Sequence, residues 1–425
     1  MISTEIKPLP WKYYIPLYLI FISLLLFATR DFSQTQQSSI GLANIHKIMS
    51  ISLAVTIVLY YFSNKLKIKR IPCAITFYSL YLVVAIIGSL MSSTWLGYSL
   101  YKLLEVVAVV LVVIYLWDLS NKYPFALSGA YNKVLLFYKL LLFLSILGVF
   151  IFPQLAIRPP SEFQEAYLPF QLFGSIVSIN ANSLGMIGAI VFYVSFISLF
   201  QKIKIKTSLF WLSISMIVVI FSQSRTAVIA LLLVIFLFIL FNGRSGIFGK
   251  LFLLVLGLGT IFFSIDVLVQ YLERGYSIEH MEKLSGRSSW WEYAWNVFIN
   301  SDTWYQYFGG GYGIASRNIL VSMGHSGAST LHSDYVDSLV STGYLGLGFL
   351  IVMLLCVVYI LVKNLIIVKK DLFILELSGI FVLLSIRSFT GPTIATHNFF
   401  LIMYLIVIVN IVLAIKQNKY KRVLQ

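Results

Sequence analysis

Three residues, Arg225, Arg287 and His332, stand at the expected starts of helices and carry side chains suited to chemistry. Arginine presents a planar fork that binds phosphate through paired hydrogen bonds, and it stays charged in apolar surroundings. The free N–H groups of a helix N-terminus also favour an anion. Neutral histidine can accept a proton from a hydroxyl group near pH 7. These residues are therefore candidates for binding phosphate and for deprotonating a hydroxyl group.

Each candidate also has a structural interpretation. Arg225 could instead cap the C-terminus of a neighbouring helix, and the sequence supports the two interpretations about equally. His332 could cap its helix beside Ser333, or ligate a metal together with Asp334 and Asp337. No further convincing metal ligand is in view, so a general base is the better interpretation of His332.

The stretch that follows Arg287 is typical of a helix lying on the membrane surface. A Ser-x-x-Glu pattern at 289–292 fits a capping box. Trp291, Trp295 and Phe298 fall on one helical face. We interpret most of the tryptophans as anchors in the headgroup layer.

Two further features have weaker functional interpretations. The glycine-rich run FGGGYG (308–313) follows no expected strand and opens no helix, so it matches a nucleotide-binding loop poorly. A hinge, or a close approach of the backbone to a ligand, fits this run better. Glu105 lies one turn after Lys102 in an apolar stretch, and we interpret that pair as structural.

The composition indicates an integral membrane protein. The chain has 425 residues, of which 59% are hydrophobic and 11% are charged, whereas soluble domains carry about 25% charged residues. The net charge of +15 would suit nucleic acid, but most lysines lie in short loops between apolar runs, where they orient helices. The two cysteines lie in apolar stretches, which argues against a disulfide framework or a cysteine metal site.

The expected fold is an all-α membrane protein with about twelve transmembrane helices and one long outer loop containing short amphipathic helices. A helix needs about 20 apolar residues to cross the hydrocarbon core. The chain divides into nine spans within 1–265, a polar catalytic loop at 266–333, and three spans with a cytoplasmic tail within 334–425. The candidate spans are 13–29, 45–62, 72–91, 99–118, 134–152, 180–200, 207–222, 225–241, 247–265, 334–362, 371–388 and 397–415.

The basic residues predict the orientation. Most of the 31 lysines and arginines fall on one side if the N-terminus is cytoplasmic, so both termini are expected in the cytoplasm and 266–333 outside. Arginine is nevertheless concentrated on the outer side, which topology alone does not explain because lysine orients helices equally well. Arg317 and Arg387 become phosphate-binding candidates on this outer-face charge alone. The outer arginines are Arg30, Arg158, Arg225, Arg274, Arg287, Arg317 and Arg387.

Three motifs in the second half, in order, carry a resemblance to a known family. SQSRTAVIALLL, then GRSSWWEYAWNVFI with FGGGYG, then LHSDYVDSLVSTGYLGLGF resemble the O-antigen ligase and Wzy-type polysaccharide polymerase superfamily of bacterial inner membranes. The similarity covers about 220–350. Each motif is short, but their order, spacing and outer-face placement are together quite specific.

The resemblance implies a GT-C-like, multi-pass membrane glycosyltransferase that needs no nucleotide sugar, metal or other cofactor. Its donor would be a glycan on undecaprenyl diphosphate, presented at the periplasmic face. Arg225 and Arg287 match the family's arginines proposed to hold the diphosphate, and His332 matches the proposed base. The implied partners are this donor, a glycan acceptor, the bilayer, and chain-length regulator and flippase proteins, with no nucleic acid.

Polymerase and ligase differ mainly in the acceptor, which is a second lipid-linked repeat unit or lipid A core. FGGGYG and the compact outer loop favour a polymerase for O-antigen, capsule or exopolysaccharide, with O-antigen ligase as the alternative. A twelve-span transporter should show repeated halves and ionisable residues near the midplane, and no repeat is visible. SEDS peptidoglycan polymerases usually have about ten spans and different loop signatures. A protein O-glycosylating ligase is a further alternative.

Overall fold

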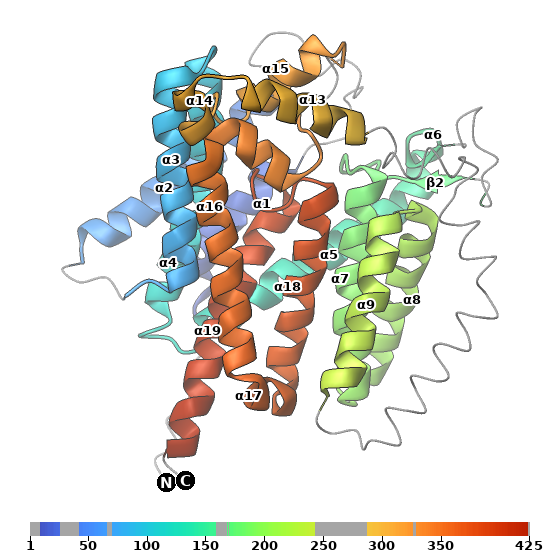
Figure 1. Ribbon diagram of the computed structural model, residues 1–425. Coiled ribbons are helices and arrows are strands. Elements are labelled where there is room, and N and C mark those ends of the chain that lie inside the picture. Colours follow the sequence, from blue (N-terminus) through green and yellow to red (C-terminus); the bar gives the residue numbers. More distant parts are fainter. Residues whose placement is uncertain are drawn as a thin grey trace.

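The computed structural model describes residues 9–25, 42–65, 70–158, 168, 170–242, 287–325 and 329–423. These residues form a bundle of long helices, with three shorter helices across one end (Figure 1). The expected span 247–265 lies outside the described residues, as do Arg30 and Arg274.

Nine helices among the described residues are long and apolar enough to cross a membrane. The expected count of twelve is not shown. In the described part of the first expected span, 13–29, a 3₁₀ turn is followed by the ten-residue α1 (Ile15–Leu24), and the eighth span contains the 17-residue α9 (Arg225–Phe241). The nine long helices are α2 (Leu42–Ser63), α3 (Cys73–Ser92), α4 (Leu96–Leu119), α5 (Ala126–Ile151), α7 (Ala181–Phe200), α8 (Ile205–Ser222), α16 (Asp334–Lys363), α18 (Leu372–Thr390) and α19 (Phe399–Val423).

Helix α19 forms the centre of the bundle. Its residues from Phe400 to Ile411 are buried on every face, as expected for a helix that is apolar all round. Helices α4, α5 and α18 pack around it, and α9 lies against the far side of α18 (Figure 1). The short α17 (Leu365–Lys370) joins α16 to α18.

A small β-structure holds the turn that precedes α9. After α6 (Pro153–Ala156), strand β1 (Ile157–Arg158) pairs antiparallel with β2 (Gln171–Leu172). The Gln171 side chain donates to the backbone oxygen of Ser222, and the Gln223 side chain donates to that of Phe170. Because Gln223 has a left-handed φ of 50°, these bonds fix a sharp turn immediately before Arg225.

Helices α13 (Arg287–Ile299), α14 (Thr303–Phe308) and α15 (Ile314–Ser322) lie across one end of the bundle (Figure 1). Trp295 and Phe298 lie on one face of α13, as expected, with ring centroids 6.1 Å apart, but the expected place in the headgroup layer is wrong for Phe298. Phe298 is fully buried in a cluster with α15 and α16, whereas Trp295 is 47% exposed. The expected capping box is also wrong, because the helix already includes Arg287.

The start of the glycine-rich run packs closely against the backbone of other helices. A Cβ on Gly309 would lie 2.2 Å from the Ser341 carbonyl carbon, and one on Gly88 of α3 would meet the Phe308 oxygen. Helix α16 kinks at Gly343, where φ is 67° and a Cβ would lie 2.3 Å from the Tyr307 carbonyl carbon. These close approaches tie α14 to α3 and α16.

Candidate active site

His332 sits in a backbone conformation that its neighbours enforce. Its φ is 58°, a left-handed value that is uncommon for residues other than glycine. The preceding Leu331 is held on both sides, since its N–H donates to Asp337 Oδ1 (2.9 Å) and its carbonyl accepts from Trp291 Nε1 (2.8 Å). Such strain persists only where the surroundings fix it, and it is typical of functional sites.

A tryptophan also packs on the imidazole itself. The Trp290 and His332 ring centroids lie 5.9 Å apart with 27° between the planes. On α13, Trp290 therefore contacts the candidate base while Trp291 holds the residue before it. These contacts are additional to the anchor role expected for most of the tryptophans. The helix pattern alone gives no signal for this role.

Asp334 is a structural anchor for the segment that follows α18. Its buried carboxylate accepts from the backbone N–H groups of Thr393 and Ile394 (both 2.8 Å) and of Ala395 (3.1 Å). The N-cap of α16 is Ser333, without a side-chain capping bond, so His332 does not cap this helix. The carboxylates of Asp334 and Asp337, both near His332, thus accept hydrogen bonds from backbone N–H groups.

Thr390, at the end of α18, brings two of the candidate arginines into one neighbourhood. Arg287 Nη1 donates to the Thr390 carbonyl oxygen (2.7 Å). The Thr390 hydroxyl oxygen lies 3.0 Å from that of Thr226, the residue after Arg225. Arg225 itself is the first residue of α9, whose N-cap is Ser224. The N-terminus of α9 and the start of α13 thus meet at one residue of α18.

Arg387 lies one turn earlier on α18 and is 5% exposed. Its Nη2 donates to Ser183 Oγ (2.9 Å) and its Nη1 to the Asn182 carbonyl oxygen (3.3 Å), while its guanidinium lies 4.2 Å from the centroid of the Phe400 ring. Two of the five N–H groups of Arg387 thus bind α7. Its Nε is buried with no hydrogen-bond partner among the described residues, and its positive charge acts on His332.

The site favours the neutral form of the histidine. Burial, together with the positive charges of Arg287 and Arg387, lowers the pKa of His332 to about 4. Burial also lowers the pKa of Arg287, but an arginine remains charged near neutral pH. The result is a neutral imidazole beside fixed positive charge, as an acid–base reaction on an anionic substrate would need.

A comparison with protein families matches residues 208–351 to the O-antigen ligase family, Wzy_C. The chain contains an O-antigen ligase domain. It is a multi-pass membrane glycosyltransferase of the kind that uses lipid-linked glycans. A comparison with curated proteins finds no match.

The O-antigen ligase domain includes four of the five predicted site residues: Arg225, Arg287, Arg317 and His332. Arg387 lies beyond it in the chain, yet the fold places it near His332. Arg317, on α15, lies in a different place, with its guanidinium carbon 5.6 Å from the centroid of the Tyr98 ring on α4. A phosphate-binding role for these arginines and a base role for His332 remain predictions.

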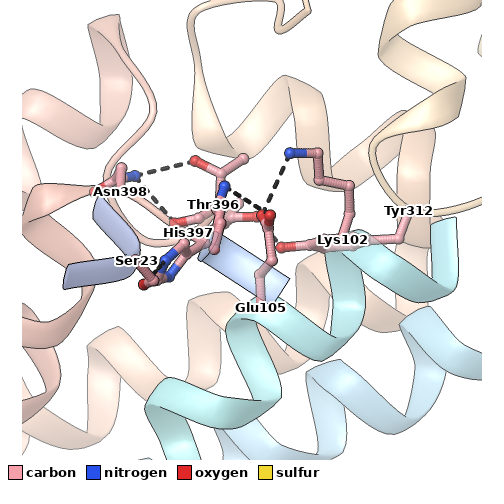
Figure 2. Close-up of polar contacts among 9 residues, drawn as sticks. Ser23, Lys102, Glu105, Tyr312, Thr396, His397 and Asn398 are labelled. Carbon is pink, nitrogen blue, oxygen red and sulfur yellow. Dashed lines mark hydrogen bonds and ion pairs between the residues drawn. The ribbon is translucent and has the colours of Figure 1, made fainter. Parts of the chain in front are cut away.

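A second polar cluster lies outside the O-antigen ligase domain. Glu105 is buried in α4 and pairs with Lys47 Nζ (2.6 Å) and Lys102 Nζ (3.3 Å). Figure 2 shows its carboxylate between Lys102 and the residues Thr396 and His397. His397 Nε2 lies 3.0 Å from Ser23 Oγ, and burial beside Lys47 lowers the pKa of His397 to about 3.

Sequence reasoning found only part of this cluster. The Glu105–Lys102 pair was predicted, but Lys47 and His397 were missed. The available signal was an ionisable residue inside or beside an apolar span, which is costly and therefore a functional candidate by default. Lys47 lies inside the second span and His397 directly before the last.

Proposed function

We propose that this chain is a polysaccharide polymerase of the bacterial inner membrane, with both termini in the cytoplasm. It would transfer a glycan from undecaprenyl diphosphate to a lipid-linked repeat unit at the outer face. The supporting observation is the neutral His332 imidazole beside Arg287 and Arg387. The same place joins α13 to the N-terminus of α9 through Thr390.

In the proposed reaction Arg225 and Arg287 hold the donor diphosphate. The bond between the anomeric carbon and the diphosphate oxygen breaks, and its electron pair stays on the diphosphate. The acceptor oxygen forms the new bond to the anomeric carbon, and its proton passes to the His332 imidazole. Fixed positive charge near the leaving group lowers such a barrier; one fixed donor is worth about 3 kcal/mol elsewhere.

The arrangement also couples donor binding to the strength of the base. In the free enzyme burial, together with the charges of Arg287 and Arg387, holds the pKa of His332 near 4, which makes the imidazole a weak base. An anionic diphosphate beside Arg287 would offset that positive charge and raise the pKa of His332. The histidine would thus become an effective base chiefly when the donor is in place.

Deletion of the gene, followed by glycan analysis, tests the activity. A polymerase predicts surface glycan that is cut to single repeat units, whereas O-antigen ligase, the alternative, predicts full-length chains retained on the carrier lipid. Unchanged glycan would contradict both. FGGGYG and the compact outer loop favour the polymerase.

Substitution tests the roles of individual residues. Arg225→Ala, Arg287→Ala and His332→Ala should each reduce transfer by about 100-fold or more at normal protein levels. His325→Ala is a matched control because His325 also contacts Trp290, at a centroid distance of 4.9 Å, but has no assigned role. Normal glycan in His332→Ala would exclude the base role.

A further inference from the structure

Two cations on the α4 side of the molecule converge on one aromatic ring. Arg317 Cζ of α15 lies 5.6 Å, and Lys102 Nζ of α4 lies 5.7 Å, from the centroid of the Tyr98 ring. Within the described part of the chain no hydrogen bond or ion pair reaches the Arg317 guanidinium. Lys102 shares its acidic partner, Glu105, with Lys47. The group therefore carries more positive than negative charge, which favours an anionic ligand.

An exposed aromatic surface adjoins these cations. Trp95 stacks on Tyr98 with 5.3 Å between the ring centroids and 22° between the planes, and Trp95 is 57% exposed. The turn that carries Trp95 is fixed to α15, because Asn318 Nδ2 donates to Thr94 Oγ1 (3.0 Å). The exposed face of the Trp95 ring, close to the Lys102 and Arg317 side chains, suits a sugar that is attached to a phosphate.

The glycine-rich run keeps this place open. Gly313, its last residue, has a φ of 71°, and a Cβ there would lie 3.5 Å from Lys102 Cγ and 3.8 Å from Tyr98 Cε1. Tyr312, beside it, is buried and donates through its hydroxyl to the carbonyl oxygen of Ala395. The run thus ends at the cations with no side chain of its own projecting toward them.

A small cavity adjoins both the residues beside this group and the segment that leads to His332. It has a volume of about 20 Å³ and is lined by Gly313, Ser316, Ser329, Thr330, Asp337 and Thr396, among others, which is room for about one water or one hydroxyl group. Ser316 Oγ and Asp337 Oδ2 are buried, and both residues line this cavity, where the Ser316 hydroxyl interacts with the Asp337 carboxylate. The other carboxylate oxygen of Asp337 binds the N–H of Leu331, next to His332.

We propose that Lys102 and Arg317 form a second phosphate subsite, which binds the phosphate of the acceptor lipid. This inference rests on the proposed function, and it separates Arg317 from the donor site. The acceptor sugar would lie on Trp95, and an acceptor hydroxyl would reach His332 past Ser316 and Asp337. Donor and acceptor phosphates would then bind on opposite sides of the base.

Binding of undecaprenyl diphosphate to the purified full-length protein in nanodiscs tests the subsite. The wild type should bind two molecules. The pair Lys102→Gln with Arg317→Gln should bind one, with about a tenfold or greater loss of affinity for the other. Arg317→Lys, which keeps the charge, should retain most of the binding and controls for folding. Two sites of unchanged affinity in the Lys102/Arg317 double variant would overturn the proposal.

A parallel titration with lipid A identifies the source of the phosphate. Binding of undecaprenyl diphosphate at this subsite supports a lipid-linked repeat unit as acceptor. Lipid A binding that the double variant loses supports the subsite with a lipopolysaccharide acceptor instead. If neither lipid depends on Lys102 and Arg317, the subsite does not exist. The donor site is judged separately by Arg287→Gln, which should lose the other diphosphate molecule.

Discussion

Trp290 and His332 stack nearly parallel although they come from two helical regions separated by more than 40 residues. The neighbouring Trp291 hydrogen-bonds the carbonyl oxygen of Leu331, so helix α13 restrains both the ring and the backbone of the candidate base. Two adjacent tryptophans are typical of a membrane anchor, but here their contacts suit a role in positioning His332.

Replacement of Trp290 should reduce turnover more than substrate binding. We expect Trp290→Ala to lower kcat about 10- to 100-fold with a small change in KM, because a misplaced base loses orientation. Trp290→Phe should recover much of the loss by restoring a stacked ring. The measurement is steady-state transfer by purified protein. Trp295→Ala, at an exposed site on the same helix, is the control, and equal losses in both variants would argue against positioning.

Asp334 should be essential for the local fold. Asp334→Asn removes the charge and leaves one oxygen to accept from three N–H groups. We expect a loss of about 2–3 kcal/mol, typical of a buried bond to a charged group, and a matching loss of transfer. Asp302→Asn is the control, because Asp302 caps the exposed start of α14 and asparagine caps a helix as well as aspartate does. Thermal unfolding in detergent compares the two, and equal midpoints would contradict the assignment.

His332 should make the stability depend on pH in a defined window. Its pKa is about 4 in the folded protein and about 6.5 in the unfolded chain. Between these values the unfolded chain binds a proton that the folded protein does not, so stability falls as pH is lowered from 6.5 to 4. The effect is at most about 3 kcal/mol. The fall should be smaller in His332→Gln than in the wild type, as measured by unfolding midpoints across this range.

The same pKa predicts the behaviour of an arginine variant. Arg287→Gln removes a positive charge that disfavours the imidazolium, so the pKa of His332 should rise. The rate of acylation of His332 by diethyl pyrocarbonate, which follows the neutral fraction, should then begin to fall at a higher pH than in the wild type. An unchanged profile would show that Arg287 does not act on His332.

Gly343, at the kink of α16, should not tolerate replacement by a residue with a side chain. Gly343→Ala would place a Cβ 2.3 Å from the Tyr307 backbone, at a φ of 67°, and we expect a loss of several kcal/mol with strongly reduced expression. Gly348→Ala, on the same helix with nothing within 4 Å of its Cβ, should be neutral or slightly stabilising. Similar protein levels for both variants would contradict this account of the kink.

The sequence predicted the elements that depend on local pattern. Apolar runs of sufficient length predicted the long helices. The position of an arginine or a histidine at the start of a helix singled out Arg225, Arg287 and His332 as candidate site residues. Each of these signals lies within a few residues of the side chain concerned. The structure then shows what no local signal contains, namely that Thr390 of a distant helix joins the starts of α9 and α13.

Contacts between distant segments are what the sequence could not predict. Arg387 was a phosphate candidate on charge alone, and its hydrogen bonds to Asn182 and Ser183, about 200 residues earlier, have no signal in the sequence. The close contacts of the glycine-rich run with Gly88 of α3 and Ser341 of α16 were likewise not predicted. Such partners depend on how helices pack, which periodicity and composition do not determine.

The close backbone contacts that glycines allow around α14 affect how a substrate can enter and leave the site. Because backbone packs directly on backbone here, no side chain can rearrange to make room. Helix α14, which lies across one end of the bundle, therefore cannot move away without breaking its packing against α3 and α16. A carrier whose tail stays among the lipids would therefore enter and leave sideways, in the plane of the bilayer. Turnover should then respond to membrane thickness and viscosity more than to the viscosity of the surrounding water.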